Sequence, residues 1–209
     1  MIIDWYFDFI SPFAYFQWLR LGELPRTIEL RPRPVVLGAI LKHWGQLGPA
    51  EIAPKRRFTY QYVTWLAARA GLPFTMPAGH PFNSLPLLRL ACALGPTSSV
   101  VERLFRFVWV EGHIPQQPEP WAGLLAEFGL ARYEDTAAVK EQLRASTDDA
   151  IRRGVFGVPT SIAAGQLVWG YDATDMLLEH CRDPGLFESA PMRRALDVPV
   201  AAARVAKPT

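Results

Sequence analysis

The residues best suited to chemistry stand at one turn near the start of the chain, where Ser11 is followed directly by Pro12. Before this turn, apolar and polar residues alternate over residues 3–9, which is typical of a β-strand. After it, apolar residues recur at helical spacing until Gly22. Serine is a good N-cap, and proline suits the first helical position because an N–H there has no intrahelical partner. The pattern predicts a hydroxyl at the positive end of a helix dipole, which either caps the helix only or also holds an anion such as a thiolate.

The elements around this turn predict an α/β fold that receives a helical insertion. Residues 27–36 alternate like a second strand, which its prolines end or push towards a sheet edge. The chain therefore opens with a βαβ unit, whose two strands are expected to be parallel. We expect helices at 37–45, 57–70, 84–94, 98–112, 120–128, 136–153 and 172–181, strands at 158–163 and 166–169, and a loosely attached tail at 189–209.

Aromatic residues of the helical block are interpreted mainly as core. Phe58, Tyr62 and Trp65 share one face of the helix expected at 57–70, together with Leu66. The residues considered for lining an apolar pocket instead are Trp44, Trp65 and Phe82.

Composition and charge exclude several kinds of partner. The 209-residue chain has a formal net charge of +2 and no basic run interleaved with aromatics, so nucleic acid is not expected. Cys92 and Cys181 stand alone, and the histidines lack metal-ligand spacing, so no metal is expected. His80 lies in a Pro/Gly loop and is interpreted as a surface residue. Because no signal peptide or membrane span is evident, we expect a cytoplasmic protein without membrane contact.

Two motifs and the order of elements resemble a known superfamily. The βαβ half, the helical insertion and the ββα half that follows Val158-Pro159 resemble the DsbA-like branch of the thioredoxin superfamily. Redox members carry Cys-x-x-Cys where this chain has Ser11-Pro12-Phe13-Ala14, which excludes exchange through an enzyme dithiol. The Ser-Pro-aromatic variant resembles kappa-class glutathione transferases and, more closely, 2-hydroxychromene-2-carboxylate isomerases. The most specific match is Gly154-Val155-Phe156-Gly157-Val158-Pro159.

The resemblance implies a thioredoxin-like fold with a large all-helical insertion domain. It places a discontinuous thioredoxin-like domain at 1–36 and 137–187, the helical insertion domain at 37–136 and a C-terminal tail at 188–209. It also implies a cis peptide between Val158 and Pro159, beside the N-terminus of the first helix. The backbone N–H and C=O of Val158 would then be free to pair with an extended peptide.

The resemblance further implies that glutathione is the cofactor and that Ser11 is catalytic, since the family serine binds the glutathione sulfur. Gln46 stands where the family usually has Asn, and Ala173 stands where it usually has Arg. The expectation from these two departures is an altered substrate preference. The other expected glutathione contacts are Pro12, Phe13, Gln46, Val158, Pro159, Tyr171 and Asp172, and the expected substrate contacts are Lys42, Lys55 and Asn83.

The implied activity is glutathione-dependent cis-trans isomerisation of 2-hydroxychromene-2-carboxylate or a similar aromatic-degradation intermediate, by a homodimer. Such a reaction needs a nucleophile that adds to an alkene and later leaves, and a thiolate suits it. A hydroxyl that donates to a thiolate contributes about 1.5–3 kcal/mol, which lowers a thiol pKa by roughly one to two units. Two alternatives stay open: a kappa-like transferase or peroxidase acting on other electrophiles, and a non-catalytic module that binds peptides beside the cis-proline.

Overall fold

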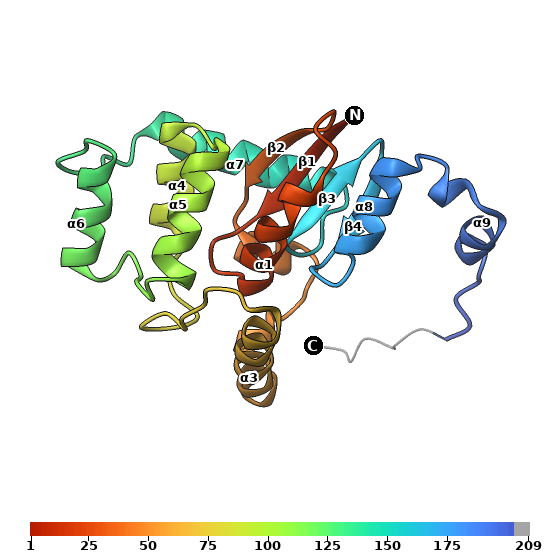
Figure 1. Cartoon of the computed structure of the whole chain (residues 1–209), viewed down its shortest axis with the longest axis horizontal. Coiled ribbons are helices and arrows are strands. Elements are labelled where there is room, and N and C mark those ends of the chain that lie inside the picture. Colours follow the sequence, from red (N-terminus) through yellow and green to blue (C-terminus); the bar gives the residue numbers. More distant parts are fainter. Residues whose placement is uncertain (203–209) are drawn as a thin grey trace.

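Within residues 1–202, which the computed structural model describes, a mixed sheet of four strands forms the centre of the molecule (Figure 1). The strand order is β2-β1-β3-β4. β1 pairs in parallel with β2 and antiparallel with β3, and β3 pairs antiparallel with β4. The parallel opening pair and the closing hairpin are thus confirmed. The strands are β1 (Ile2–Phe7), β2 (Glu29–Pro34), β3 (Thr160–Ala163) and β4 (Gln166–Trp169).

The segment between β2 and β3 contains helices and, in the part of the chain described, no strand. In Figure 1, α4, α5 and α6 lie together on one side of the sheet, α8 lies on the other, and α3 projects from the body. Helix α7 packs both on α4, in the expected insertion domain, and on β2, in the expected thioredoxin-like domain. The structure therefore does not separate the two domains, and the boundary between them stays a prediction. The helices are α1 (Pro12–Arg20), α2 (Leu37–His43), α3 (Ala53–Ala70), α4 (Leu85–Leu94), α5 (Ser98–Trp109), α6 (Pro118–Glu127), α7 (Ala137–Arg152), α8 (Thr174–Arg182) and α9 (Ala190–Leu196).

The expected tail contains one helix that the sequence analysis missed. Helix α9 has Pro191 in its first turn, where proline is tolerated, but none of its residues is buried. It packs on the short turn Leu186–Glu188 and lies at the end of the molecule, away from the sheet (Figure 1). The last part of the tail, residues 203–209, lies outside the described residues. None of the helices within residues 1–202 is long and apolar enough to cross a membrane.

Strand β1 is buried on both faces, as expected of a central strand. Trp5 and Phe7 stack with their ring centroids 4.5 Å apart and pack with Phe105 of α5 in the larger apolar cluster. On the opposite face, the fully buried Tyr6 belongs to a second cluster that includes Ile40 of α2. Alternate side chains of one strand therefore join two separate layers of helices to the sheet.

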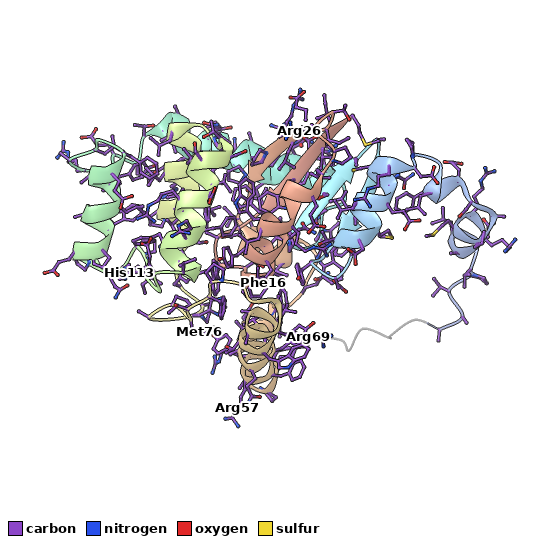
Figure 2. The ribbon with its side chains drawn as sticks, in the orientation of Figure 1. Phe16, Arg26, Arg57, Arg69, Met76 and His113 are labelled. Atoms are coloured by element: carbon purple, nitrogen blue, oxygen red, sulfur yellow. The ribbon has the colours of Figure 1, made fainter. Side chains whose placement is uncertain are left out.

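Three aromatic side chains of α3 are exposed, so the prediction that they belong to the core is wrong. Phe58, Tyr62 and Trp65 are 66%, 37% and 51% exposed. Their rings stack at 5.9 and 6.0 Å along the helix, and the Arg69 guanidinium lies 5.1 Å from the Trp65 ring. Helix α3 is anchored instead through small buried residues such as Ala67. Figure 2 shows Arg57 and Arg69 on this projecting helix.

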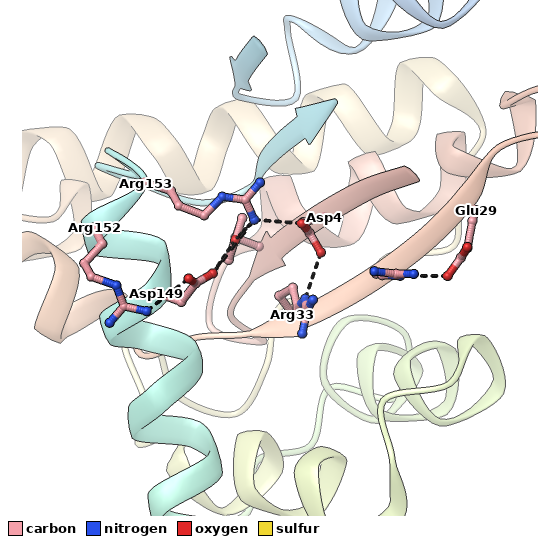
Figure 3. A network of polar contacts seen from close by, with 8 residues as sticks. Asp4, Glu29, Arg33, Asp149, Arg152 and Arg153 are labelled. Carbon is pink, nitrogen blue, oxygen red and sulfur yellow. Dashed lines mark hydrogen bonds and ion pairs between the residues drawn. The ribbon is translucent and has the colours of Figure 1, made fainter. Parts of the chain in front are cut away.

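A network of charged side chains ties the end of α7 to the sheet (Figure 3). Arg153 donates to the Asp4 carboxylate at 2.7 Å and to the Tyr6 hydroxyl at 2.6 Å, and Arg33 of β2 donates to the other Asp4 oxygen at 2.9 Å. The Tyr6 hydroxyl donates to Asp149 at 3.0 Å. Burial opposes the ionisation of Asp4, but hydrogen bonds and charges from Arg153 and Arg33 outweigh it, so the pKa of Asp4 is lowered. The network holds the chain in place directly before the 154–160 stretch.

Replacing Asp4, the partly buried acid of this network, should cost stability in a pH-dependent way. We expect Asp4→Asn to lower the free energy of unfolding at neutral pH by about 1.5–3 kcal/mol, because two charge-assisted hydrogen bonds are lost. The pKa of Asp4 is lowered from 3.8 in the folded state, so its contribution is complete above that value and is lost as the pH falls through the folded-state pKa. Urea unfolding at several pH values measures the difference.

The matched control is Glu29→Gln, which removes the partner of Arg31 in an exposed ion pair on β2. Figure 3 shows Glu29 beside the network. This variant should change stability by less than about 1 kcal/mol. Equal losses from the two variants, or a loss for Asp4→Asn that does not shrink in acid, would contradict the assignment.

Candidate active site

The turn after β1 and the loop before β3 leave the sheet at the same end. Tyr6 lies opposite Thr160 in the antiparallel pair, so the residues after Tyr6 and those before Thr160 continue in the same direction. The Val158–Pro159 peptide is cis, as the resemblance implied. Within residues 1–202, neither the N–H nor the C=O of Val158 has a hydrogen-bond partner. This end of the sheet therefore presents the start of α1 together with an unpaired backbone edge.

Ser11 is the N-cap of α1, as predicted. Its Oγ accepts a hydrogen bond from the Ala14 N–H at 3.2 Å, and Pro12 occupies the first helical position. That bond uses an oxygen lone pair and leaves the hydroxyl hydrogen available to an acceptor. Ser11 is 7% exposed, and the half-buried ring of Phe13 lies 6.1 Å from the ring of Tyr62 on α3. The Ser11 hydroxyl and the positive end of the α1 dipole therefore lie at the same position.

Asp8 is a buried residue of this site whose role the sequence analysis missed. Its carboxylate accepts from the Ile10 N–H at 3.1 Å and from the Leu37 N–H at 3.0 Å, so it joins the turn before Ser11 to the start of α2. Burial raises the pKa of Asp8, and its hydrogen bonds, including one from Ser84, oppose that rise. The alternation over residues 3–9 identified Asp8 only as a polar position, because nothing in that pattern indicates a partner at Leu37.

Two main-chain carbonyls before Ser11 are contacted by ring N–H groups of distant side chains. The Trp109 indole donates to the Phe9 carbonyl at 2.9 Å, and His80 Nε2 lies 2.9 Å from the Ile10 carbonyl. His80 is half-buried, so its interpretation as a surface residue is wrong. No local motif pairs His80 with this turn, because the two are distant in sequence and meet only in the folded chain.

The turn that contains Tyr171 and Asp172 is fixed between the cis-proline and α1. The Gly170 N–H donates to the Pro159 carbonyl at 2.9 Å, and its carbonyl accepts from Gln17 Nε2 at 3.0 Å. Tyr171 packs against α1, with its ring 5.8 Å from that of Phe16, which Figure 2 labels near the centre of the molecule. Asp172 is exposed and does not cap α8, whose N-cap is Ala173, so the capping role considered for it is wrong.

Lys42 and Gln46 lie on a segment that contacts the cis-proline loop. The Trp44 indole donates to the Val155 carbonyl at 2.9 Å, and Val158 packs on the cluster that contains Ile40 of α2. The side chains of Lys42 and Gln46 are exposed and, in the described part of the chain, have no hydrogen-bond or ion-pair partner. Both side chains are therefore unoccupied within the described residues.

Within residues 1–202, no hydrogen bond or ion pair joins Lys55 or Asn83 to Ser11. Lys55 is exposed in the first turn of α3, and the Asn83 side chain accepts from the Leu85 N–H at 3.1 Å at the start of α4. Hollows of about 300 and 570 Å³ lie beside Phe58 and beside Arg31, and neither is lined by Ser11. Within residues 1–202, no group of three or more His, Cys, Asp or Glu side chains is placed to hold a metal ion.

Comparison with known proteins assigns the family. The sequence profile of the family described as DSBA-like thioredoxin domain matches residues 2–182. The chain belongs to this family. The thioredoxin-like fold with a helical insertion, expected from the resemblance, is thereby confirmed. In this chain the fold consists of the mixed four-stranded sheet and the helices inserted between β2 and β3.

Within the DSBA-like family, curated relatives include several 2-hydroxychromene-2-carboxylate isomerases. That of Sphingobium xenophagum is 29% identical over 87% of this chain and 98% of its own length, and that of Pseudomonas putida is 30% identical over 85% and 92%. Glutathione S-transferase kappa 2 of Caenorhabditis elegans is 24% identical over 88% and 92%. A solved 2-hydroxychromene-2-carboxylate isomerase superposes with a TM-score of 0.75 at 26% identity, covering 92% of this chain and 99% of its own.

Gln17 is the buried side chain that joins α1 to the Gly170 turn, and its loss should be costly. Gln17→Leu leaves the Trp5 indole N–H, now 2.7 Å from Gln17 Oε1, and the Gly170 carbonyl without their partner. We expect the free energy of unfolding to fall by about 1–3 kcal/mol for each unsatisfied group, as measured by urea titration. The control Gln61→Leu, on the exposed face of α3, should stay within about 0.5 kcal/mol of the parent. A similarly small effect at position 17 would contradict the anchoring role.

Proposed function

We propose that the chain is a glutathione-dependent cis-trans isomerase of 2-hydroxychromene-2-carboxylate or a closely similar aromatic carboxylate. The observation that supports this most is the Ser11 hydroxyl, which stands at the N-terminus of α1 at the sheet end shared with the unpaired backbone of Val158. The full-length likeness to 2-hydroxychromene-2-carboxylate isomerases supports the reaction type. When bound, glutathione would supply the thiolate that the residues around Ser11 lack.

The residues at this end of the sheet suit a small extended peptide that carries a thiol. Val158 offers one N–H and one C=O for strand-like pairing with the peptide backbone. The Ser11 hydroxyl would donate to the sulfur, worth about 1.5–3 kcal/mol for a charged acceptor, and the dipole of α1 would add several tenths of a kcal/mol. These contributions would lower the thiol pKa from about 8.5 to near neutrality.

The remaining contacts are proposed from the family resemblance, and for Asp172 and Lys42 the exposure of the side chain supports them. Asp172 is exposed and does not cap α8, and its carboxylate would accept a hydrogen bond from the amino group of the peptide. Lys42 has no carboxylate partner in the described chain and would pair with a carboxylate of the substrate. Completing the set, Pro12, Phe13, Gln46, Pro159 and Tyr171 would contact glutathione, and Lys55 and Asn83 would contact the substrate.

The near full-length likeness to a kappa-class glutathione transferase supports a second candidate, a kappa-like transferase that uses the same thiolate on other electrophiles. The two departures from the usual family residues bear on substrate preference. Ala173 has no charged group to pair with Asp172, and Gln46 has a longer side chain than the asparagine usual in the family. Both changes affect the surroundings of the ligand and leave Ser11 in place. A non-catalytic module that binds peptides at Val158 is the outcome to be accepted if glutathione does not bind.

The proposal includes two further properties: the protein forms a homodimer, and it acts in the cytoplasm. The exposed rings of Phe58, Tyr62 and Trp65 provide apolar surface that association would cover. The cytoplasm is a reducing compartment in which thiols such as glutathione remain reduced.

Ser11 should be required for ionisation of the bound thiol and not for folding. Ser11→Ala should reduce turnover by about 10-fold to 100-fold, because a donor worth about 1.5–3 kcal/mol is lost, and should cost about 1 kcal/mol of stability through loss of the cap. Ser11→Thr retains both the hydroxyl and the cap and should stay active. Ser11→Asp retains a cap but repels a thiolate, so it should fold and be inactive. Turnover of Ser11→Ala equal to the parent across neutral pH would refute the assigned role.

Parallel assays should separate the two candidate enzymes. We expect 2-hydroxychromene-2-carboxylate to be isomerised faster with glutathione than without it, and glutathione to be conjugated to a generic aryl halide much more slowly. The reverse order of rates would identify the transferase. Absence of glutathione binding by calorimetry at millimolar concentration would exclude both enzymes and leave the binding module.

A further inference from the structure

The peptide group between Ile10 and Ser11 is held at both of its polar atoms. The Ser11 N–H donates to the Asp8 carbonyl at 3.1 Å, and the Ile10 carbonyl lies 2.9 Å from His80 Nε2. Because a peptide group is planar, fixing both atoms fixes the plane from which the Ser11 side chain projects. The direction of the Ser11 hydroxyl therefore depends on a side chain that is distant in sequence.

The His80 ring is itself fixed from several sides. Its Nδ1 lies 2.8 Å from the Tyr60 hydroxyl of α3, and its ring packs 5.7 Å from the Trp109 ring and 6.2 Å from the Phe82 ring. A carbonyl oxygen can only accept, so Nε2 carries the hydrogen and donates to Ile10. The Tyr60 hydroxyl contacts both Nδ1 and the His80 carbonyl, so its single hydrogen is shared between these two acceptors of the neutral residue. Burial lowers the pKa of His80, although its bond to Ile10 opposes this, so the neutral ring is favoured.

We propose that His80 is a positioning residue for Ser11, which acts by holding the Ile10 carbonyl and so aims the Ser11 hydroxyl at the sulfur of bound glutathione. The inference rests on the function proposed above. His80 does not touch the reacting atoms, and its influence passes through one peptide group. Trp109 performs a similar task at the preceding carbonyl, but it is a fully buried core residue whose removal would disturb packing. Of these two side chains, His80 is therefore the one that can be substituted with little damage to the fold.

Two amide side chains of different reach provide the test. Glutamine extends its amide nitrogen to about the position of Nε2, whereas asparagine reaches only about as far as Nδ1, so His80→Gln can donate to Ile10 and His80→Asn cannot. Tyr60→Phe is the control, because it removes the hydroxyl that contacts Nδ1 and the His80 carbonyl and leaves the Nε2 donor in place. The measurements are kcat and KM in the isomerase assay, and the ultraviolet absorbance of the thiolate when bound glutathione is titrated with pH.

We expect His80→Asn to lower kcat by about 10-fold to 100-fold, as misplacement of a catalytic group does, and to raise the pH at which the bound thiol ionises. The KM for glutathione should change little, because Val158 and Asp172 are unaffected. His80→Gln and Tyr60→Phe should stay close to the parent in all three quantities. In the ligand-free protein, the amide hydrogens of Ser11 and Ala14 should exchange faster in His80→Asn than in His80→Gln.

Other results would overturn the inference. Folded His80→Asn with the thiol ionisation and kcat of the parent would show that His80 does not aim Ser11. Equal losses in His80→Asn and His80→Gln, or failure of both to fold by circular dichroism, would assign His80 a purely structural role. If the parent itself shows no thiolate with glutathione, the proposed function fails, and unequal exchange rates at Ser11 would still establish the contact through Ile10.

Discussion

The antiparallel pairing of β1 with β3 is the constraint on which the candidate site depends. It places Tyr6 opposite Thr160 and so joins two segments that the whole helical block separates in the sequence. A slip of one residue would exchange the two faces of β1 and move Tyr6 into the cluster that holds Trp5. Because both faces are buried, such a slip would be costly, and the register is well specified. The start of α1 and the cis-proline loop therefore meet at a defined edge.

Buried polar side chains then fix the loops at that edge. Asp8 joins the turn before Ser11 to α2, and Gln17 joins α1 to the Gly170 turn. A buried polar group is costly unless it is hydrogen-bonded, and both of these side chains make several bonds. Apolar residues of the same size would fill the space but would not dictate which main-chain atom lies where. The polar contacts thus specify one loop geometry where apolar packing alone would allow several.

The sequence was informative wherever a local pattern carries the physics. The Ser11 cap, the strands around it and most helices follow from residues close together in the chain, and the Val158-Pro159 motif indicated the cis peptide. It was not informative about which face of α3 packs, because the spacing of Phe58, Tyr62 and Trp65 shows only that they share a face. The contact between His80 and Ile10 joins distant residues through side-chain geometry, for which no spacing rule exists.

The hydrogen bond from the Ala14 N–H to Ser11 has an electronic effect besides closing the first turn of α1. A hydroxyl oxygen that accepts a hydrogen bond is polarised, and its own hydrogen becomes a better donor, an example of cooperativity between consecutive bonds. The helix therefore increases the acidity of the same group that it orients. Unwinding the first turn would weaken that donor even if the serine stayed where it is, so its strength as an acid is a property of the helix and not of residue 11 alone.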